Sequence, residues 1–489
     1  VVNHARTRAT HENGPVAGLP GGHLTTQNTI EIDLAPVPDL TEALHHALPG
    51  LLPVQAKALL EHAGGNPRHL EQIIAFLREN EEFFEDFDKA NALTEEGLRD
   101  ALEETHDILK VVMRRLRDAP VEVQEAICLA SLQGMRFVSD IVNDLAKACL
   151  SGERADALKK ASDPFSMVSA RHKASIAEFS ERLFYLVAEK RRRSLKGLHD
   201  TEALQTALQD ILRERLNLID VDAVNDVDAA VMTLGLAAQV FGETEPVLAL
   251  KALSAIVKLE LARYAYPAAV TAADSFFSLF TPIALDGGKL ELKGIWRITD
   301  LLISEGRNSH ALEILNAVLD QARSTAKRLQ TAESQHELVD TLSQLGVALI
   351  ADGDLSAAAL VFHEGLDIAR QLAARLPTPE YQERLWGSLV FAGDAAADAG
   401  DSGAAAQDWN EALSIARDLA ARNKTPKNLR NLAFSLNRVG LAASDAGDWS
   451  TSSSAFQEQL LVERDLANQL QTPQSQRYLA SPIDSLAYV

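Results

Sequence analysis

The residue types best suited to chemistry in the first part of the chain lie in the run Gly64-Gly-Asn-Pro-Arg-His. The glycine pair ends one helix, Asn66 caps the next, and Pro67 takes the first helical position, where no amide hydrogen is needed. Arg68 then follows at a helix N-terminus, where free amides and the helix dipole favour an anion. The pattern therefore predicts a helix start that carries a candidate anion contact.

A second candidate set is acidic and lies in the C-terminal part of the chain. By their register, its members fall on the first helices of the helical repeats described below. Carboxylates gathered on one face predict a basic or polar partner surface. Each of them taken singly is also what a solvated helix surface carries. The set consists of Asp340, Asp394, Asp398, Asn437 and Asp445.

Motifs for enzyme chemistry are absent from the sequence. No Ser/His/Asp motif, HExxH spacing or GxxxxGK[ST] occurs, and the glycine-rich run Gly18-Leu-Pro-Gly-Gly-His lacks the lysine and hydroxyl that phosphates and magnesium need. The chain has two cysteines, Cys128 and Cys149, which predict buried thiols rather than a disulfide framework or a metal site. We therefore expect no catalytic residue, no metal site and no binding or hydrolysis of ATP by this chain alone.

A repeat of 47 residues fills the chain from about Leu301 onward. Several columns of residues recur at this interval, and so many independent columns exclude coincidence. The columns are the turn glycines Gly306, Gly353, Gly400 and Gly447; the aspartates Asp354, Asp401 and Asp448; the arginines Arg323, Arg370, Arg417 and Arg464; the threonines Thr331, Thr378, Thr425 and Thr472; the prolines Pro379, Pro426 and Pro473; and the glycines Gly346, Gly393 and Gly440.

Each unit has the pattern of a helix, a short turn and a longer helix. Leu345-Gly346, Ala358 and Phe362 resemble the Leu-Gly, small and aromatic positions of the tetratricopeptide signature. The next unit matches with Gly393, Ala405, Trp409 and Ala412, and the last with Gly440 and Phe456. In the last unit Ser452 and Gln459 replace the expected alanines, which predicts a looser terminal repeat. Stacked helical pairs leave a curved surface that the core does not use, so we expect a protein ligand on the concave repeat surface.

In context, the helix start at Asn66, Pro67 and Arg68 resembles the lid of signal-transduction ATPases of the STAND class, which are relatives of the AAA+ proteins. A strand over residues 28–34 and short helices precede it, as in that family. The resemblance implies that Pro67 packs near an adenine and that Arg68 faces the phosphates. The phosphate-binding core is missing from the 489 residues, so ATP or ADP with magnesium would be cofactors only if a nucleotide-binding core lies upstream of Val1.

From Ile108 the sequence resembles the winged-helix domain that follows the lid in the same ATPases. Pro120 begins an apolar helix, and the runs 167–173 and 179–183 correspond to the wing and the final helix. The basic run Lys190-Arg-Arg-Arg could suggest nucleic acid, but a solvated helix C-terminus that complements the dipole is the favoured interpretation. In the helical stretch that follows, the aromatics Tyr264, Tyr266, Phe276 and Phe277 are expected to belong to the core.

These patterns predict a mainly α protein: small lid and winged-helix domains, then a tetratricopeptide-like α-solenoid with 47-residue repeats. The net charge of −22 disfavours nucleic acid as a partner, and no apolar run is long enough to span a membrane. We place the chain in the cytoplasm. The expected domains are 1–38, the tail of a nucleotide-binding core or an irregular segment; 39–88, lid-like with an acidic connector; 89–200, winged-helix-like; 201–300, irregular helical repeats; and 301–489, regular repeats.

Two functions fit this organisation. The first is the sensor and regulatory region of a STAND ATPase, in which a macromolecular ligand, such as a phage or stress signal, binds the repeats and releases an autoinhibited nucleotide domain. That resemblance also implies homo-oligomerisation on activation. The alternative is a free-standing tetratricopeptide adaptor or scaffold without a nucleotide switch, or part of a transcription regulator.

Overall fold

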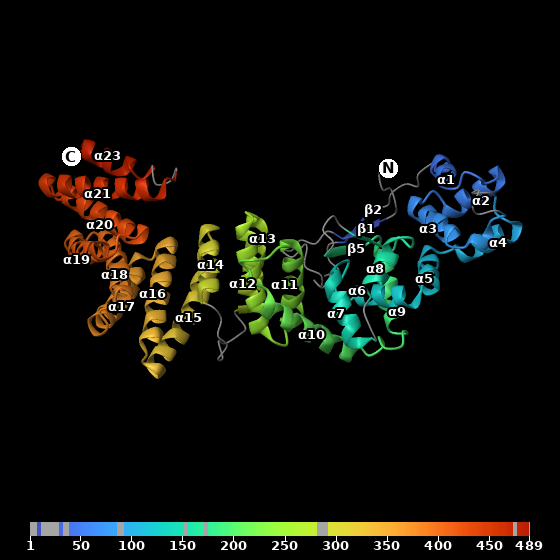
Figure 1. Ribbon diagram of the computed structural model, residues 1–489, viewed down its shortest axis with the longest axis horizontal. Helices are drawn as coiled ribbons and strands as arrows, with labels where there is room; N and C mark the ends of the chain where they lie inside the picture. Colours follow the sequence, from blue (N-terminus) through green and yellow to red (C-terminus); the bar gives the residue numbers. More distant parts are fainter. Residues whose placement is uncertain are drawn as a thin grey trace. The chain divides into compact units, whose positions relative to one another are not determined.

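The computed structural model describes residues 7–10, 29–32, 39–85, 92–150, 154–170, 175–280, 292–472 and 477–488. The chain is mainly α-helical, as predicted, and divides into two compact units, residues 1–275 and 276–489 (Figure 1). Three features of the sequence lie outside the described residues: the glycine-rich run 18–23, the end of the acidic connector at 86–88, and the tip of the predicted wing at 171–174.

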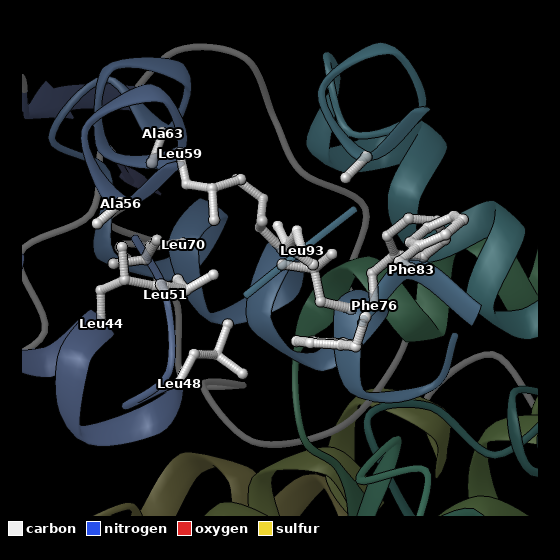
Figure 2. Close-up of a cluster of buried hydrophobic side chains, with 14 of the residues drawn as sticks. Leu44, Leu48, Leu51, Ala56, Leu59, Ala63, Leu70, Phe76, Phe83 and Leu93 are labelled. Atoms are coloured by element: carbon white, nitrogen blue, oxygen red, sulfur yellow. The ribbon is translucent and has the colours of Figure 1, made fainter. Parts of the chain in front are cut away.

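The first unit begins with a strand pair and a group of short helices. Strand β2 (Thr29–Ile32) lies within the predicted strand and pairs antiparallel with β1 (Thr7–Thr10). The helices are α1 (Thr41–Ala47), α2 (Pro53–Ala63), α3 (Pro67–Arg78), the 3-10 turn η1 (Glu81–Phe83), α4 (Glu95–Glu104) and α5 (Ile108–Asp118). Their apolar faces share one core, in which the side chains point toward one another (Figure 2): Leu44, Leu48, Leu51, Ala56, Leu59, Ala63, Leu70, Phe76, Phe83 and Leu93.

A small mixed module follows in the same unit. It comprises α6 (Val121–Ala130), β3 (Arg136–Val138), α7 (Ser139–Cys149), α8 (Ala155–Ser162), β4 (Val168–Ala170), β5 (Ile176–Phe179) and α9 (Arg182–Arg192). The three strands form an antiparallel sheet in which β5 lies between β3 and β4. Phe137 of β3 packs edge-on against Phe179 of β5, with ring centroids 5.5 Å apart. The sheet therefore contributes aromatic side chains to the core of an otherwise helical module.

Longer helices connect this module to the repeats: α10 (Thr201–Leu218), α11 (Val227–Phe241), α12 (Pro246–Ala262), α13 (Tyr266–Phe280) and α14 (Leu292–Ser304). Phe276 is buried, as expected. The expectation that Tyr264 and Tyr266 belong to the core is wrong, because their exposed fractions are 78% and 51%. Tyr264 lies in the turn after α12 with φ of 61°, so it leaves the helical stripe on which the prediction relied.

The 47-residue period appears in the helices of the second unit. The first helices α16 (Ala332–Asp352), α18 (Pro379–Asp398) and α20 (Pro426–Asp445) begin 47 residues apart, and so do the second helices α17 (Leu355–Arg375), α19 (Ser402–Arg422) and α21 (Trp449–Leu470). Helix α15 (Asn308–Leu329) precedes them, and α23 (Ala480–Tyr488) contacts α21. All four turn glycines have positive φ, from 72° to 92°, which only glycine adopts without strain. The repeat prediction is confirmed.

An aromatic ring lies directly on the backbone of the first helix in each unit. A Cβ atom added to Gly346 would stand 2.3 Å from the ring of Phe362, and one added to Gly393 would stand 2.7 Å from Trp409. Gly440 and Phe456 repeat the contact at 2.7 Å. Side chains do not approach this closely, so the glycine column is a packing requirement.

Consecutive second helices are joined by an ion-pair ladder. Each rung joins an arginine to a glutamate 41 residues later, with Nη2–Oε2 distances of 2.5 to 2.7 Å. The side chains are partly exposed, so each rung contributes about 0–1 kcal/mol and serves mainly to set the register. The rungs are Arg323 to Glu364, Arg370 to Glu411, and Arg417 to Glu458.

The interior of the last unit is more polar than that of the others. Glu463 is 8% exposed and stands where the preceding units have the buried alanines Ala416 and Ala369. Its Oε2 atom has no hydrogen-bond partner, and burial raises the pKa of its carboxyl. Ser452 and Gln459 are also buried here, and the Ser452 hydroxyl donates to the carbonyl of Gly440 at 2.9 Å. Burying an ionised carboxylate without a full set of partners opposes folding.

We expect Glu463→Gln to stabilise the chain at pH 8 and to lose that advantage as the pH falls. Burial gives the carboxyl a higher pKa in the folded protein than in the unfolded chain, where it is about 4.3. Above the folded pKa the charged carboxylate destabilises the folded state in full, and below the unfolded pKa the carboxyl is neutral in both states and this destabilisation is gone. Urea-denaturation midpoints at pH 8.0, 6.0 and 4.0 measure the effect. Glu458→Gln is the control, since Glu458 lies on the same helix, is partly exposed and pairs with Arg417. An equal gain for Glu463→Gln at every pH would contradict the burial explanation.

Two glycines of α18 provide a matched test of the ring contacts. Gly393→Ala is expected to cost about 1–3 kcal/mol, because its methyl group would overlap Trp409. Gly387→Ala on the same helix meets nothing within 4 Å and is expected to stabilise the helix by up to about 1 kcal/mol. Circular dichroism during urea denaturation reports both midpoints. Similar shifts for the two variants would show that the ring does not require a glycine.

Candidate functional site

One stripe of residues runs along the first helix of every unit at spacings of four, three and four. Such a stripe occupies one side of a helix. None of its members is buried, although the neighbouring positions of the same helices are. We call this set the first-helix stripe: Asp340, Gln344, Val347 and Ala351 on α16; Gly387, Phe391, Asp394 and Asp398 on α18; Phe434, Arg438, Leu441 and Asp445 on α20.

Ion pairs hold the three first helices side by side. Arg384 of α18 contacts Asp340 of α16 at 2.8 Å, and Arg438 of α20 contacts Asp394 of α18 at 3.0 Å. Lys427 of α20 pairs with Glu383 of α18. These ion pairs neutralise charge along the stripe and fix the order in which the three first helices lie side by side.

The structure places the five predicted partner-binding residues in different surroundings. Asp340 and Asp394 are half-buried and engaged in ion pairs, and Asp394 also accepts the indole N–H of Trp409 at 2.9 Å. Asn437 is half-buried, and its amide lies 3.5 Å from Oε1 of Gln459 on α21. Asp398 and Asp445 end their helices, are exposed, and have no ion pair among the described residues. The open negative charge of this face therefore lies at Asp398 and Asp445.

An apolar patch that charge-based reasoning missed lies on α20. Phe434 and Leu441 are 39% and 41% exposed and lie seven residues apart on the stripe. The guanidinium of Arg438, between them, stands 4.8 Å from the centre of the Phe434 ring. Trp386 of α18 meets that ring edge-on at 6.4 Å and donates its indole N–H to the hydroxyl of Ser435 at 2.8 Å. Phe434 is thus held on the surface rather than free to turn inward.

The predicted nucleotide-binding residues lie at the start of α3. The side chain of Asn66 accepts the backbone N–H groups of Arg68 at 3.1 Å and His69 at 3.2 Å, and Pro67 takes the first helical position. Gly64 ends α2 in the left-handed conformation. The predicted helix start is confirmed. Two of the amides that an anion could use are already occupied by Asn66, so the Arg68 side chain is the group at this site still suited to an anion.

A buried arginine joins α3 and α5 to the mixed module. Arg115 is 3% exposed, and its Nε–H donates to Glu79 Oε1 and Oε2 at 3.0 and 2.9 Å. It also donates to Gln72 and to the carbonyl of Phe165, and it lies over the ring of Phe184. Gln72 in turn donates to Glu181 at 2.6 Å. No motif marks Arg115, which sits among other basic residues of an amphipathic helix.

The basic run at the end of α9 is only partly a solvated helix end. Lys190 and Arg193 are exposed, as expected. Arg191 donates to the amide oxygen of Gln124 at 3.1 to 3.2 Å, and Arg192 is buried. The expectation is therefore wrong for Arg192, because the helix turns that side chain toward α6, where its charge contributes to the field at Cys128.

Two features are absent from the described residues. No cluster of three or more His, Cys, Asp or Glu side chains in this part of the chain is arranged to hold a metal ion. None of the helices there combines the length and the apolar character that crossing a membrane requires.

Known proteins resemble the chain at low sequence identity. No family model and no curated protein matches it. BtubC (BKLC) from P. vanneervenii is 13% identical over 50% of this chain and 93% of that one, with a TM-score of 0.35. A STAND protein with a tetratricopeptide repeat sensor from Pyrococcus horikoshii is 12% identical over 90% of this chain and 62% of that one, with a TM-score of 0.34. Apo RapI is 11% identical over 59% and 82%, with a TM-score of 0.37. Likenesses of this size assign neither a family nor a function.

Proposed function

We propose that the second unit recognises a protein ligand through the first-helix stripe. The observation that carries this proposal is the exposure of four stripe residues on α18 and α20, namely Asp398, Phe434, Leu441 and Asp445, while buried positions of the same helices form the core. Exposed Phe434 and Leu441 supply apolar area for binding, and Asp398 and Asp445 supply unpaired charge. The proposed ligand is a protein segment with apolar and basic side chains.

Charge reversal at the stripe tests this function. We expect peptides selected from a phage-displayed random 12-residue library against the full chain to lose roughly three- to tenfold in affinity when Asp398 and Asp445 are both changed to lysine. A long-range attraction of about 1 kcal/mol becomes a repulsion, and the loss should shrink at high salt. Fluorescence polarisation with labelled peptides measures the affinities.

The second helices offer a matched control. Asp418 on α19 and Asp465 on α21 are exposed, lie 47 residues apart and have no ion pair among the described residues, as is also true of Asp398 and Asp445. Asp418→Lys with Asp465→Lys changes the net charge equally and should leave peptide affinity unchanged. Equal losses in both double variants would indicate a non-specific charge effect, and the proposed face would be wrong.

For the whole protein we propose the sensor and regulatory region of a STAND ATPase. Ligand on the repeats would favour the open form of an autoinhibited nucleotide domain, with oligomerisation on activation. Support comes from the first unit: α3 has a capped start at Asn66 and Pro67, and after η1, α4 and α5 the chain forms a helix, a strand, two helices, two strands and a final helix. In this proposal that order of elements corresponds to a winged helix. In this proposal Asn66, Pro67 and Arg68 meet ATP or ADP held by an upstream core with magnesium, in the cytoplasm.

A free-standing adaptor without a nucleotide switch, or part of a transcription regulator, would use the same repeat surface. The two proposals differ in what the gene encodes before Val1. We expect a strand followed by GxxxxGK[ST] about 150–300 residues upstream. Sequencing the gene to its start codon measures this. A start codon immediately before Val1 would contradict the ATPase proposal and leave the adaptor.

A further inference from the structure

Gly387 is a glycine in the middle of a helix that has no packing reason to be there. Glycine inside a helix costs about 1 kcal/mol relative to alanine, so a helix keeps it where a neighbour or a ligand needs the space. Six glycines lie within helices α16 to α21, and at Gly387 alone an added Cβ atom would meet nothing within 4 Å. Its φ lies outside the left-handed range that would require glycine.

The position of Gly387 makes this open space part of the first-helix stripe. One repeat earlier the stripe carries Asp340, which is paired with Arg384, and one repeat later it carries the exposed ring of Phe434. Trp386, beside Gly387, holds an edge of that ring. The stripe therefore has a gap at Gly387, bordered by an aromatic side chain on one side and by a neutralised ion pair on the other.

Four charged side chains near the gap are paired with one another. Arg384 and Asp340 are paired with each other, and so are Lys427 and Glu383, so no unpaired charge of these four faces the gap. Among the stripe residues of this helix, the carboxylate without an ion pair is Asp398, eleven residues after Gly387, while Glu380, seven residues before Gly387, is also exposed. Eleven residues of helix span about 16 Å. An extended peptide covers that distance with about five residues.

We infer that the gap at Gly387 receives a bulky apolar side chain of the protein ligand, and that a lysine or arginine about five residues away meets Asp398 and Asp445. This inference rests on the proposed function and specifies the ligand as an extended segment with one apolar anchor and one basic group. The bare backbone at Gly387 lets the anchor lie against Phe434, where its apolar surface leaves water.

Filling the gap is the test. Peptides selected from the random 12-residue library against the full chain are expected to share a Trp, Phe or Leu with a Lys or Arg about five positions away. Gly387→Leu should weaken these peptides at least tenfold, and Gly387→Ala should weaken them less, while the melting temperature of both variants equals or exceeds that of the wild type. Gly403→Leu on the second helix α19 is the control and should leave affinity unchanged.

The outcomes separate the two proposals. Peptides that respond to the Asp398 and Asp445 reversals yet bind Gly387→Leu within twofold of the wild type would overturn the gap and leave the proposed face intact. Enriched peptides without the apolar and basic pair would also overturn the inference. If the library yields no peptide that binds the wild-type chain, the proposed function fails together with it.

Discussion

An aromatic ring packed on bare helix backbone is the contact on which the repeat array depends. At Gly346, Gly393 and Gly440 the ring of the second helix fills the place that a side chain of the first would take. The two helices of a unit can then approach closely, and the remaining apolar positions close around the contact. A unit cannot bury its apolar face alone, so the next unit must stack on it, and the ion-pair ladder between second helices follows from that stacking.

The first unit is joined by a different kind of contact. Arg115 is buried and satisfied by Glu79, Gln72 and a main-chain carbonyl, so it orients α3 and α5 on the mixed module. Burial raises the pKa of the Glu79 carboxyl, and the neighbouring Arg115 acts in the opposite direction. Removal of one partner would leave the other charge uncompensated in a dry interior, so the pair enforces one geometry more than it adds stability.

The sequence predicted those features whose cause lies within one helix or recurs at a fixed interval. The turn glycines, the Asn66 cap and the two helices of each unit are of this kind. The arginine column was visible at the 47-residue step, but its glutamate partners lie 41 residues away on another helix, and their pairing is a property of the stacking. Arg115 was missed because its contacts join segments that are distant in the sequence. The exposed turn at Tyr264 was missed because a single backbone angle produces no periodic pattern in the sequence. Among the predicted partner-binding residues, the sequence alone could not distinguish Asp340 and Asp394, which form ion pairs, from Asp398 and Asp445, which form none among the described residues.

Stability and surface chemistry depend on different residues of the repeats, which explains why the first-helix stripe can determine binding specificity. The ring contacts and buried alanines supply the stability of the array, and partly exposed ion pairs such as Arg384 with Asp340 contribute about 1 kcal/mol or less each. The exposed residues of the stripe are therefore free of the packing constraint that fixes the glycine column, whereas Val347 and Phe391 pack against the core. The row Asp340, Gly387 and Phe434 illustrates the result: one structural position carries a carboxylate, no side chain and an aromatic ring in three successive units. A core position with that variation would unfold the repeat, whereas on this face it produces a surface whose chemistry changes along its length.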